Sequence, residues 1–133
     1  MDQYGYVYAL AVSGTNLYVG GTFKSTGGLQ ANGIAKWNGT AWSALGAGMG
    51  QNGYVSVLAV SGTNVYAGGD FTTAGGNAAN YIAKWNGSAW STLGSGMNGN
   101  VRALAVSGTN LYAGGYFTMA GGNAANCISL VVE

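Results

Sequence analysis

The sequence predicts an all-β protein built from one repeated unit of short antiparallel strands. The segment 55–96 has near-copies that begin at residues 7 and 101, at offsets of 48 and 46 residues. Self-similarity at a fixed period of about 20 to 50 residues is typical of repeat architectures. Each copy contains short apolar runs bounded by turn residues, which predicts strands rather than helices. Glycine supplies 26 of the 133 residues at recurring places, and proline is absent.

The first two strands of each copy are predicted to form a hairpin. The first strand, VYALAV at residues 7–12, is apolar on both alternating faces, so we expect both faces to be covered. The turn SGTN follows, and it recurs after residues 60 and 106. The second strand ends in a glycine pair, Gly20-Gly21 in the first copy, where backbones are expected to pack closely or to bulge.

Two further strands complete the unit after a polar loop, which covers residues 72–80 in the middle copy. The third strand is predicted at 81–85 and the fourth at 89–93. Asn86-Gly87 lies between them and predicts a type I′ turn, which needs positive φ at both central residues. Each unit is therefore expected to be a meander of four antiparallel strands.

The third copy departs from this pattern. Ile128 matches Ile82, but Val131 occupies the position of Trp85, and no Asn-Gly turn follows. Two alternatives remain: the third unit has three strands with 128–132 as its outer edge, or another chain completes it.

The complete unit resembles a blade of a β-propeller. Within that class it is similar to the kelch repeat and to glycine-rich repeats of large secreted bacterial proteins. The matching residues of the middle copy are Gly68-Gly69, Trp85, Trp90, Leu93 and Met97. The unit departs from kelch in having Trp in strand three and few acidic loop residues. The near-identity of the copies indicates recent duplication or an engineered sequence.

The resemblance implies blade 1 at 7–49, blade 2 at 55–97 and an incomplete blade 3 at 101–133, about 2.75 blades in all. Propellers close with about four to eight blades, so a closed ring would need identical chains to associate. A homodimer of six blades is preferred, and a homotrimer of nine is second. The residues expected in packing between blades or chains are Val7, Val55, Val101, Trp37, Trp42, Trp85, Trp90, Ile128 and Val131.

Composition argues against several functions. Charged residues are 5% of the chain and the net charge is +1, which favours neither nucleic acid nor an anionic membrane as partner. No apolar run is long enough to span a membrane. The N-terminus lacks the pattern of a signal peptide, and the location stays open. Histidine is absent and Cys127 is the only cysteine, so we expect no enzyme activity, metal, cofactor or intrachain disulfide.

One rim of the blades is the candidate ligand face. It is expected to collect Asn32, Asn80, Asn126, Asp70, Met49 and Met97 from the loops after strands two and four. These residues predict a shallow polar face for a sugar; alternatively, they are turn formers that tolerate positive φ. The predicted function is a non-enzymatic, self-assembling scaffold or interaction module. The alternative is a carbohydrate-binding propeller with one shallow site per blade.

Two repeat positions differ in chemistry between the copies. One holds Tyr8, Ser56 and Arg102, and the other holds Thr22, Asp70 and Tyr116. Such positions are free surface in a purely structural repeat, whereas in a binding protein they would carry specificity.

Overall fold

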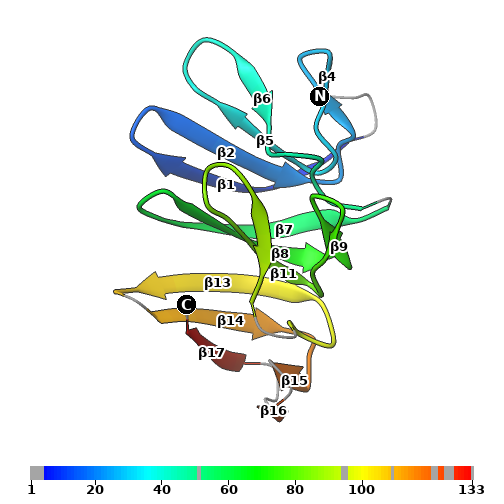
Figure 1. Cartoon of the computed structure of the whole chain (residues 1–133), viewed down its shortest axis with the longest axis vertical. Coiled ribbons are helices and arrows are strands. Elements are labelled where there is room, and N and C mark those ends of the chain that lie inside the picture. Colours follow the sequence, from blue (N-terminus) through cyan, green and yellow to red (C-terminus); the bar gives the residue numbers. More distant parts are fainter. Residues whose placement is uncertain are drawn as a thin grey trace.

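The computed structural model describes residues 5–50, 52–93, 96–108, 110–120, 123–124 and 128–132; of the side chains after Thr118 nothing is described. These residues form antiparallel strands and contain no helix, and hence none that could span a membrane. Three larger sheets lie one beside the next along the long axis of the molecule (Figure 1). The prediction of an all-β, antiparallel chain is confirmed.

The first and second sheets each have four strands in chain order, apart from a small inserted hairpin. In the first sheet the order is β1 (Val7–Ser13), β2 (Asn16–Gly21), β5 (Ile34–Trp37) and β6 (Trp42–Ala44).

The second sheet follows the same order with β7 (Tyr54–Ser61), β8 (Asn64–Asp70), β11 (Ile82–Trp85) and β12 (Trp90–Thr92). The predicted four-stranded meander is therefore confirmed in both complete copies.

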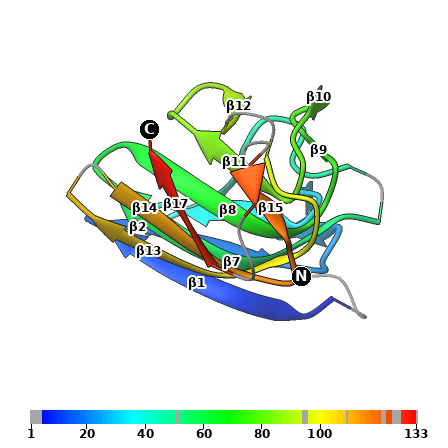
Figure 2. The same cartoon turned by 90° about the horizontal axis from the view of Figure 1, so that it is seen from below.

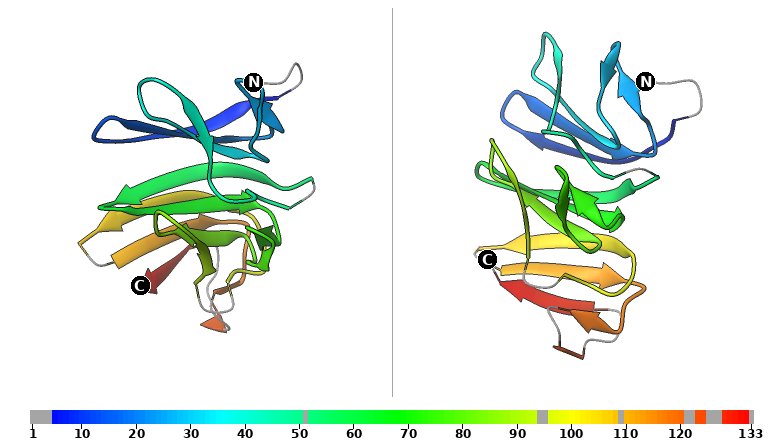
Figure 3. Two further views of the ribbon diagram at one scale, coloured as in Figure 1. Left: turned by 45° about the horizontal axis from the view of Figure 1, so that its top comes forward. Right: turned by 45° about the vertical axis from the view of Figure 1, so that its right-hand side comes forward.

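The third sheet has three strands, β13 (Val101–Ser107), β14 (Asn110–Gly115) and β17 (Ile128–Val132). β17 pairs with β14 from Gly114↔Ile128 to Asn110↔Val132, and so forms the outer edge. This agrees with the first of the two alternatives for the third copy. Figure 3 shows the three sheets from two further directions.

A small hairpin interrupts each connection between the second and third strands of a unit. These hairpins are β3–β4 (Ser25–Thr26 and Leu29–Gln30), β9–β10 (Thr73–Ala74 and Asn77–Ala78) and β15–β16 (Met119–Ala120 and Asn123–Ala124). The prediction of a plain polar loop over residues 72–80 is therefore wrong. Two-residue strands are too short to show an alternating pattern, which explains why the sequence does not reveal them.

The Asn-Gly turns differ from the expected type I′ geometry. Gly39 and Gly87 have positive φ, at 101° and 103°, but Asn38 and Asn86 do not. Instead, the Asn38 side-chain oxygen accepts hydrogen bonds from the main-chain N–H groups of Thr40 and Ala41, both at 2.9 Å. The turn is thus stabilised by an Asn side chain that imitates a backbone acceptor.

The third strand of the second sheet begins one residue later than predicted. Tyr81 has φ of 68°, in the left-handed region, and so precedes the strand that starts at Ile82. Gly33 holds the equivalent place in the first copy, with φ of 88°. Glycine adopts this left-handed conformation more readily than other residues.

Two buried hydrophobic clusters lie between the sheets, and a further one, Val19, Phe23, Ala31 and Ala35, lies within the first unit. One cluster joins the first and second sheets and includes Tyr18, Val55, Leu58 and Trp90. A second cluster joins the second and third sheets and includes Tyr66, Val101 and Leu111. Stability therefore depends on packing of neighbouring units, as is typical of repeat proteins.

Candidate functional site

Neighbouring sheets pack in the same way at both internal interfaces. The first valine of each later sheet lies over the first glycine of the glycine pair in the sheet before it. A Cβ added to Gly20 would lie 2.5 Å from Cγ1 of Val55, and one added to Gly68 would lie 2.6 Å from Cγ1 of Val101. Only a residue without a side chain leaves this space, which explains the glycine at these two positions.

The corresponding valine of the first sheet has no sheet before it. Val55 and Val101 are each 0% exposed, whereas Val7 is 43% exposed. Leu10 and Val12 on the same side of β1 are also exposed, although the equivalent Leu58 is buried. We call this surface of Val7, Leu10 and Val12 the front face. The prediction that strand 7–12 is covered on both sides is therefore wrong for this chain, because nothing in the described structure packs in front of β1.

The opposite end of the molecule exposes the other half of the same interface. Tyr18 and Tyr66 face the next sheet and are 8% and 0% exposed, but the equivalent Tyr112 is 41% exposed. Ala103 and Ala105 on β13 are exposed beside it. We call this surface of Ala103, Ala105 and Tyr112 the back face. It contains a shallow, mainly apolar hollow of about 190 Å³.

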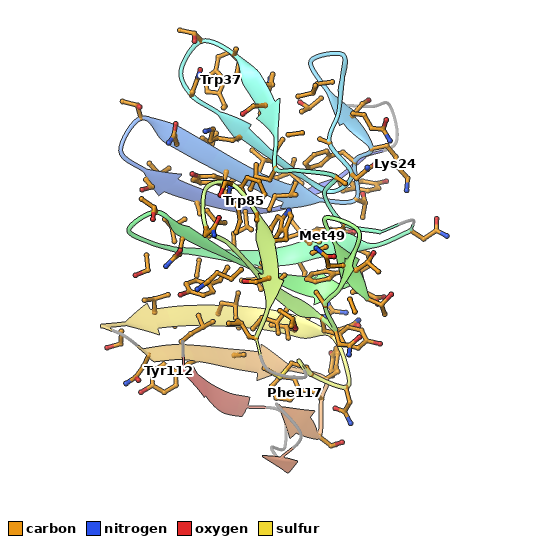
Figure 4. The ribbon with its side chains drawn as sticks, in the orientation of Figure 1. Lys24, Trp37, Met49, Trp85, Tyr112 and Phe117 are labelled. Atoms are coloured by element: carbon orange, nitrogen blue, oxygen red, sulfur yellow. The ribbon has the colours of Figure 1, made fainter. Side chains whose placement is uncertain are left out.

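Trp90 links the second sheet to the first. Its indole Nε1 donates a hydrogen bond of 2.7 Å to the carbonyl oxygen of Leu45. Trp85 lies beside it and would approach a Cβ at Gly46 to 3.3 Å. Figure 4 shows Trp85 between the first two sheets and Trp37 at the outer end of the first sheet. The ring centroids of Trp37 and Trp42 are 5.3 Å apart.

The residues predicted for packing thus divide into three groups. Val55, Val101, Trp85 and Trp90 lie between sheets of this chain. Val7, Trp37 and Trp42 are the half-buried or exposed equivalents on the first sheet. Ile128 and Val131 lie in β17, of which only the backbone is described.

The asparagines and methionines of the predicted ligand face hold the connections between units. The main-chain N–H of Met49 donates to the carbonyl of Asn32 at 2.9 Å, and Met97 donates to Asn80 at 3.0 Å. The Nδ2 of Asn32 also donates to the carbonyl of Ala47 at 3.0 Å. Both methionine side chains are buried, so they pack in the core and do not contribute to an exposed face.

Asp70 of that predicted face lines a hollow. Together with Asn52, Thr72 and Thr73 it borders a shallow depression of about 340 Å³. Asn126 lies outside the described residues. The alternative interpretation as turn residues accounts for Asn32, whose φ is 52°.

The first strands of the three sheets, β1, β7 and β13, follow one another along one side of the molecule (Figure 2). Residues of these strands line a further polar pocket. It has a volume of about 420 Å³ and is lined by Tyr8, Tyr54, Ser56 and Arg102. We call it the bulge pocket, because three of these residues are β-bulges. For example, Val7 pairs with Gly21 and Ala9 with Gly20, which leaves Tyr8 as the extra residue.

The same irregularity places Ser56 between Val55 and Val57, and Arg102 between Val101 and Ala103. These three positions differ in chemistry between the copies, but the sequence does not show that they line one pocket. The signal that could have located them is the glycine pair opposite each one, which accommodates a bulge.

Three contacts organise the bulge pocket. The rings of Tyr8 and Tyr54 meet edge to face with centroids 5.8 Å apart. The hydroxyl of Ser56 donates to the carbonyl of Val101 at 2.7 Å and so ties the second sheet to the third. The guanidinium carbon of Arg102 lies 5.1 Å from the centroid of the Tyr116 ring. Over the described ranges, no group of three or more Cys, Asp or Glu side chains could hold a metal ion.

Comparisons with known proteins agree with the fold. Neither a known family model nor a curated protein matches the sequence. The structure is similar to the crystal structure of the computationally designed Ika8 protein, with a TM-score of 0.57 and 14% sequence identity. The match covers 96% of this chain and 46% of that chain, so this chain spans about half the length of that structure. At this identity the similarity concerns the fold alone, and it defines a repeat-like, all-β protein.

Proposed function

We propose that the chain is a non-enzymatic β-propeller segment that assembles by binding further copies of itself. In this assembly, the front face of one chain packs on the back face of the next. The occupant of each open face is thus a second copy of the chain, and the product is a closed ring of sheets.

One observation carries the proposal: the two open faces are the two halves of an interface that the chain already forms twice. Val55 packs on Gly20, and Val101 packs on Gly68. The equivalent pair is Val7, which is exposed on the front face, and Gly114, which borders the hollow of the back face. A second copy would therefore bury Val7 and Tyr112 by contacts whose geometry is present in the chain.

Such a contact joins different surfaces of the two partners. Interfaces of this head-to-tail kind generate closed rings when the rotation between subunits closes. Two copies would give six sheets, which lies within the range of about four to eight blades for propellers, whereas three copies would give nine. The dimer is therefore the preferred assembly.

The mass of the chain in solution tests this proposal. We expect light scattering after size exclusion to give twice the chain mass of 13.3 kDa for a six-sheet ring, or three times for nine sheets. Leu10→Asp places a carboxylate on the exposed front face and should yield a folded monomer. Thr15→Asp adds the same charge at an exposed turn residue outside both faces, and should leave the mass unchanged. A wild-type chain that stays monomeric would overturn the proposal.

A further inference from the structure

We propose that the bulge pocket is a binding site for a small molecule that carries a carboxylate beside a hydroxylated ring. This inference concerns a surface other than the front and back faces, and goes beyond assembly. It is carried by the placement of three divergent side chains around one cavity.

The bulges explain why residues from three sheets meet in one place. A β-bulge leaves its extra residue outside the regular ladder and re-aims its side chain, and bulges are frequent beside active sites. Here Tyr8, Ser56 and Arg102 are the extra residues of β1, β7 and β13. The three first strands are neighbours. The bulge residue of each strand therefore lines the same pocket.

In the three first strands, the residue that lines the pocket varies in chemistry, whereas most other residues are the same. The three first strands read VYALAVS, VSVLAVS and VRALAVS, which are identical at five of seven positions. A sixth position varies only between alanine and valine. The bulge position alone changes its chemistry, from a phenol to a small hydroxyl to a guanidinium. Packing of the sheets constrains the other positions, whereas these three side chains differ where they border the cavity.

Arg102 gives the pocket its preference for an anion. The guanidinium is planar and can stack on an aromatic ring with its face while its N–H donors point outward in the plane. The guanidinium carbon lies 5.1 Å from the centroid of the Tyr116 ring, within cation–π distance, and Arg102 is exposed. A carboxylate matches the outward donors because it can accept two parallel hydrogen bonds from one guanidinium.

The other residues of the pocket indicate a ring with hydroxyl groups. Tyr8 and Tyr54 form an aromatic wall that can pack against the apolar side of a sugar or an aromatic ring. Ser56 donates its hydroxyl proton to Val101, so its oxygen lone pairs remain to accept a hydrogen bond from a ligand hydroxyl. The volume of about 420 Å³ is sufficient for a molecule with one ring.

The pocket remains open when a neighbouring sheet is present. Arg102 is exposed even though the second sheet packs against the third. Tyr8 occupies the equivalent position on the first sheet, so a second copy on the front face would leave it exposed in the same way. Ser56, which has a sheet on both sides, is half-buried, so ligand binding is measured at a protein concentration at which the mass of the assembly is known.

Two acids and their neutral analogues test the chemistry and distinguish a sugar from an aromatic ligand. Binding of galacturonate, galactose, p-hydroxybenzoate and p-hydroxybenzyl alcohol would be measured by calorimetry and by NMR shifts of the pocket residues. We expect at least one acid to bind and its neutral analogue to bind at least about tenfold more weakly, because a hydrogen bond to a charged group is lost. If neither acid binds, or if the neutral analogues bind equally well, the proposal is wrong.

Two variants locate the site. Arg102→Gln should weaken binding of the acid about tenfold or more, whereas Lys36→Gln removes an equal charge from β5 and should leave it unchanged. Tyr8→Ala removes one of the two rings of the aromatic wall and should weaken both the acid and its analogue. Unchanged affinity in Arg102→Gln, with the fold verified by circular dichroism, would overturn the proposal. The mass of the assembly is a separate measurement, so failure of either proposal can be recognised independently.

Discussion

The indole Nε1 of Trp90 in the second sheet donates to the main-chain carbonyl of Leu45 at 2.7 Å, in the segment directly after β6 of the first sheet. Trp90 is buried, so this donor and acceptor are both removed from water. Loss of one partner in such a buried pair leaves the other without its hydrogen bond, which costs about 1–3 kcal/mol. The equivalent Trp42 is half-buried on the first sheet, where no sheet precedes it in the described structure.

Substitution of Trp90 in the second sheet should therefore reduce stability more than the same substitution of Trp42 in the first sheet. We expect Trp90→Phe to lower the free energy of unfolding by about 2 kcal/mol, through loss of the hydrogen bond and of part of the ring. Trp42→Phe is the matched control and should cost less. Urea denaturation of both variants at one protein concentration measures the difference. Equal losses would show that the Leu45 hydrogen bond contributes little.

The contact between Gly20 and Val55 provides a test of the packing between sheets. Gly20→Ala places a Cβ 2.5 Å from Val55 Cγ1, and overpacking of this kind costs about 1–3 kcal/mol. Val55→Ala in the same chain removes the obstructing methyl group, so the double variant should lose less stability than the two single losses combined. An interaction energy of about 0.5–3 kcal/mol is typical of residues in contact. Strict additivity in denaturant titrations would contradict the contact.

The repeat and its meander could be predicted because they depend on local signals. Glycine pairs, SGTN turns and apolar runs recur at fixed offsets, and each predicts a strand or turn without reference to the rest of the fold. The small hairpin β9–β10 could not be predicted, since strands of two residues have no period. The type I′ prediction for the Asn-Gly turns is wrong, because an Asn-Gly pair does not reveal whether the backbone or the side chain supplies the acceptor.

The candidate sites could be predicted only in part. The divergence of Tyr8, Ser56 and Arg102 is visible in the sequence, but their convergence depends on bulges and on the stacking of sheets. The place of Met49 in a loop predicts an exposed rim residue, yet its side chain is buried between units. Whether a loop side chain turns toward solvent or toward the core is decided by the neighbouring unit, which a pattern within one repeat does not describe.

Asn38 should stabilise its turn through the side-chain oxygen. That oxygen accepts from the Thr40 and Ala41 N–H groups and from the Thr40 hydroxyl, each at 2.9 Å. Asn38→Ala removes the acceptor and should lower the free energy of unfolding by about 1 kcal/mol, since the turn is exposed to water. Asn38→Asp keeps an acceptor in the same place and should cost less. Equal destabilisation by both variants would contradict this role.

The direction of assembly can be tested by mixing two variants that each disable one face. Leu10→Asp blocks the front face and keeps the back face, whereas Ala105→Asp does the reverse. Because a head-to-tail contact joins unlike surfaces, each variant alone should be monomeric, and an equimolar mixture should form a pair through the two intact faces. This pair forms one contact rather than the two of a closed dimer, so it should dissociate at higher concentration than the wild type. Sedimentation velocity over a concentration series measures this. If Ala105→Asp alone assembled like the wild type, the front faces would bind each other and the head-to-tail arrangement would be wrong.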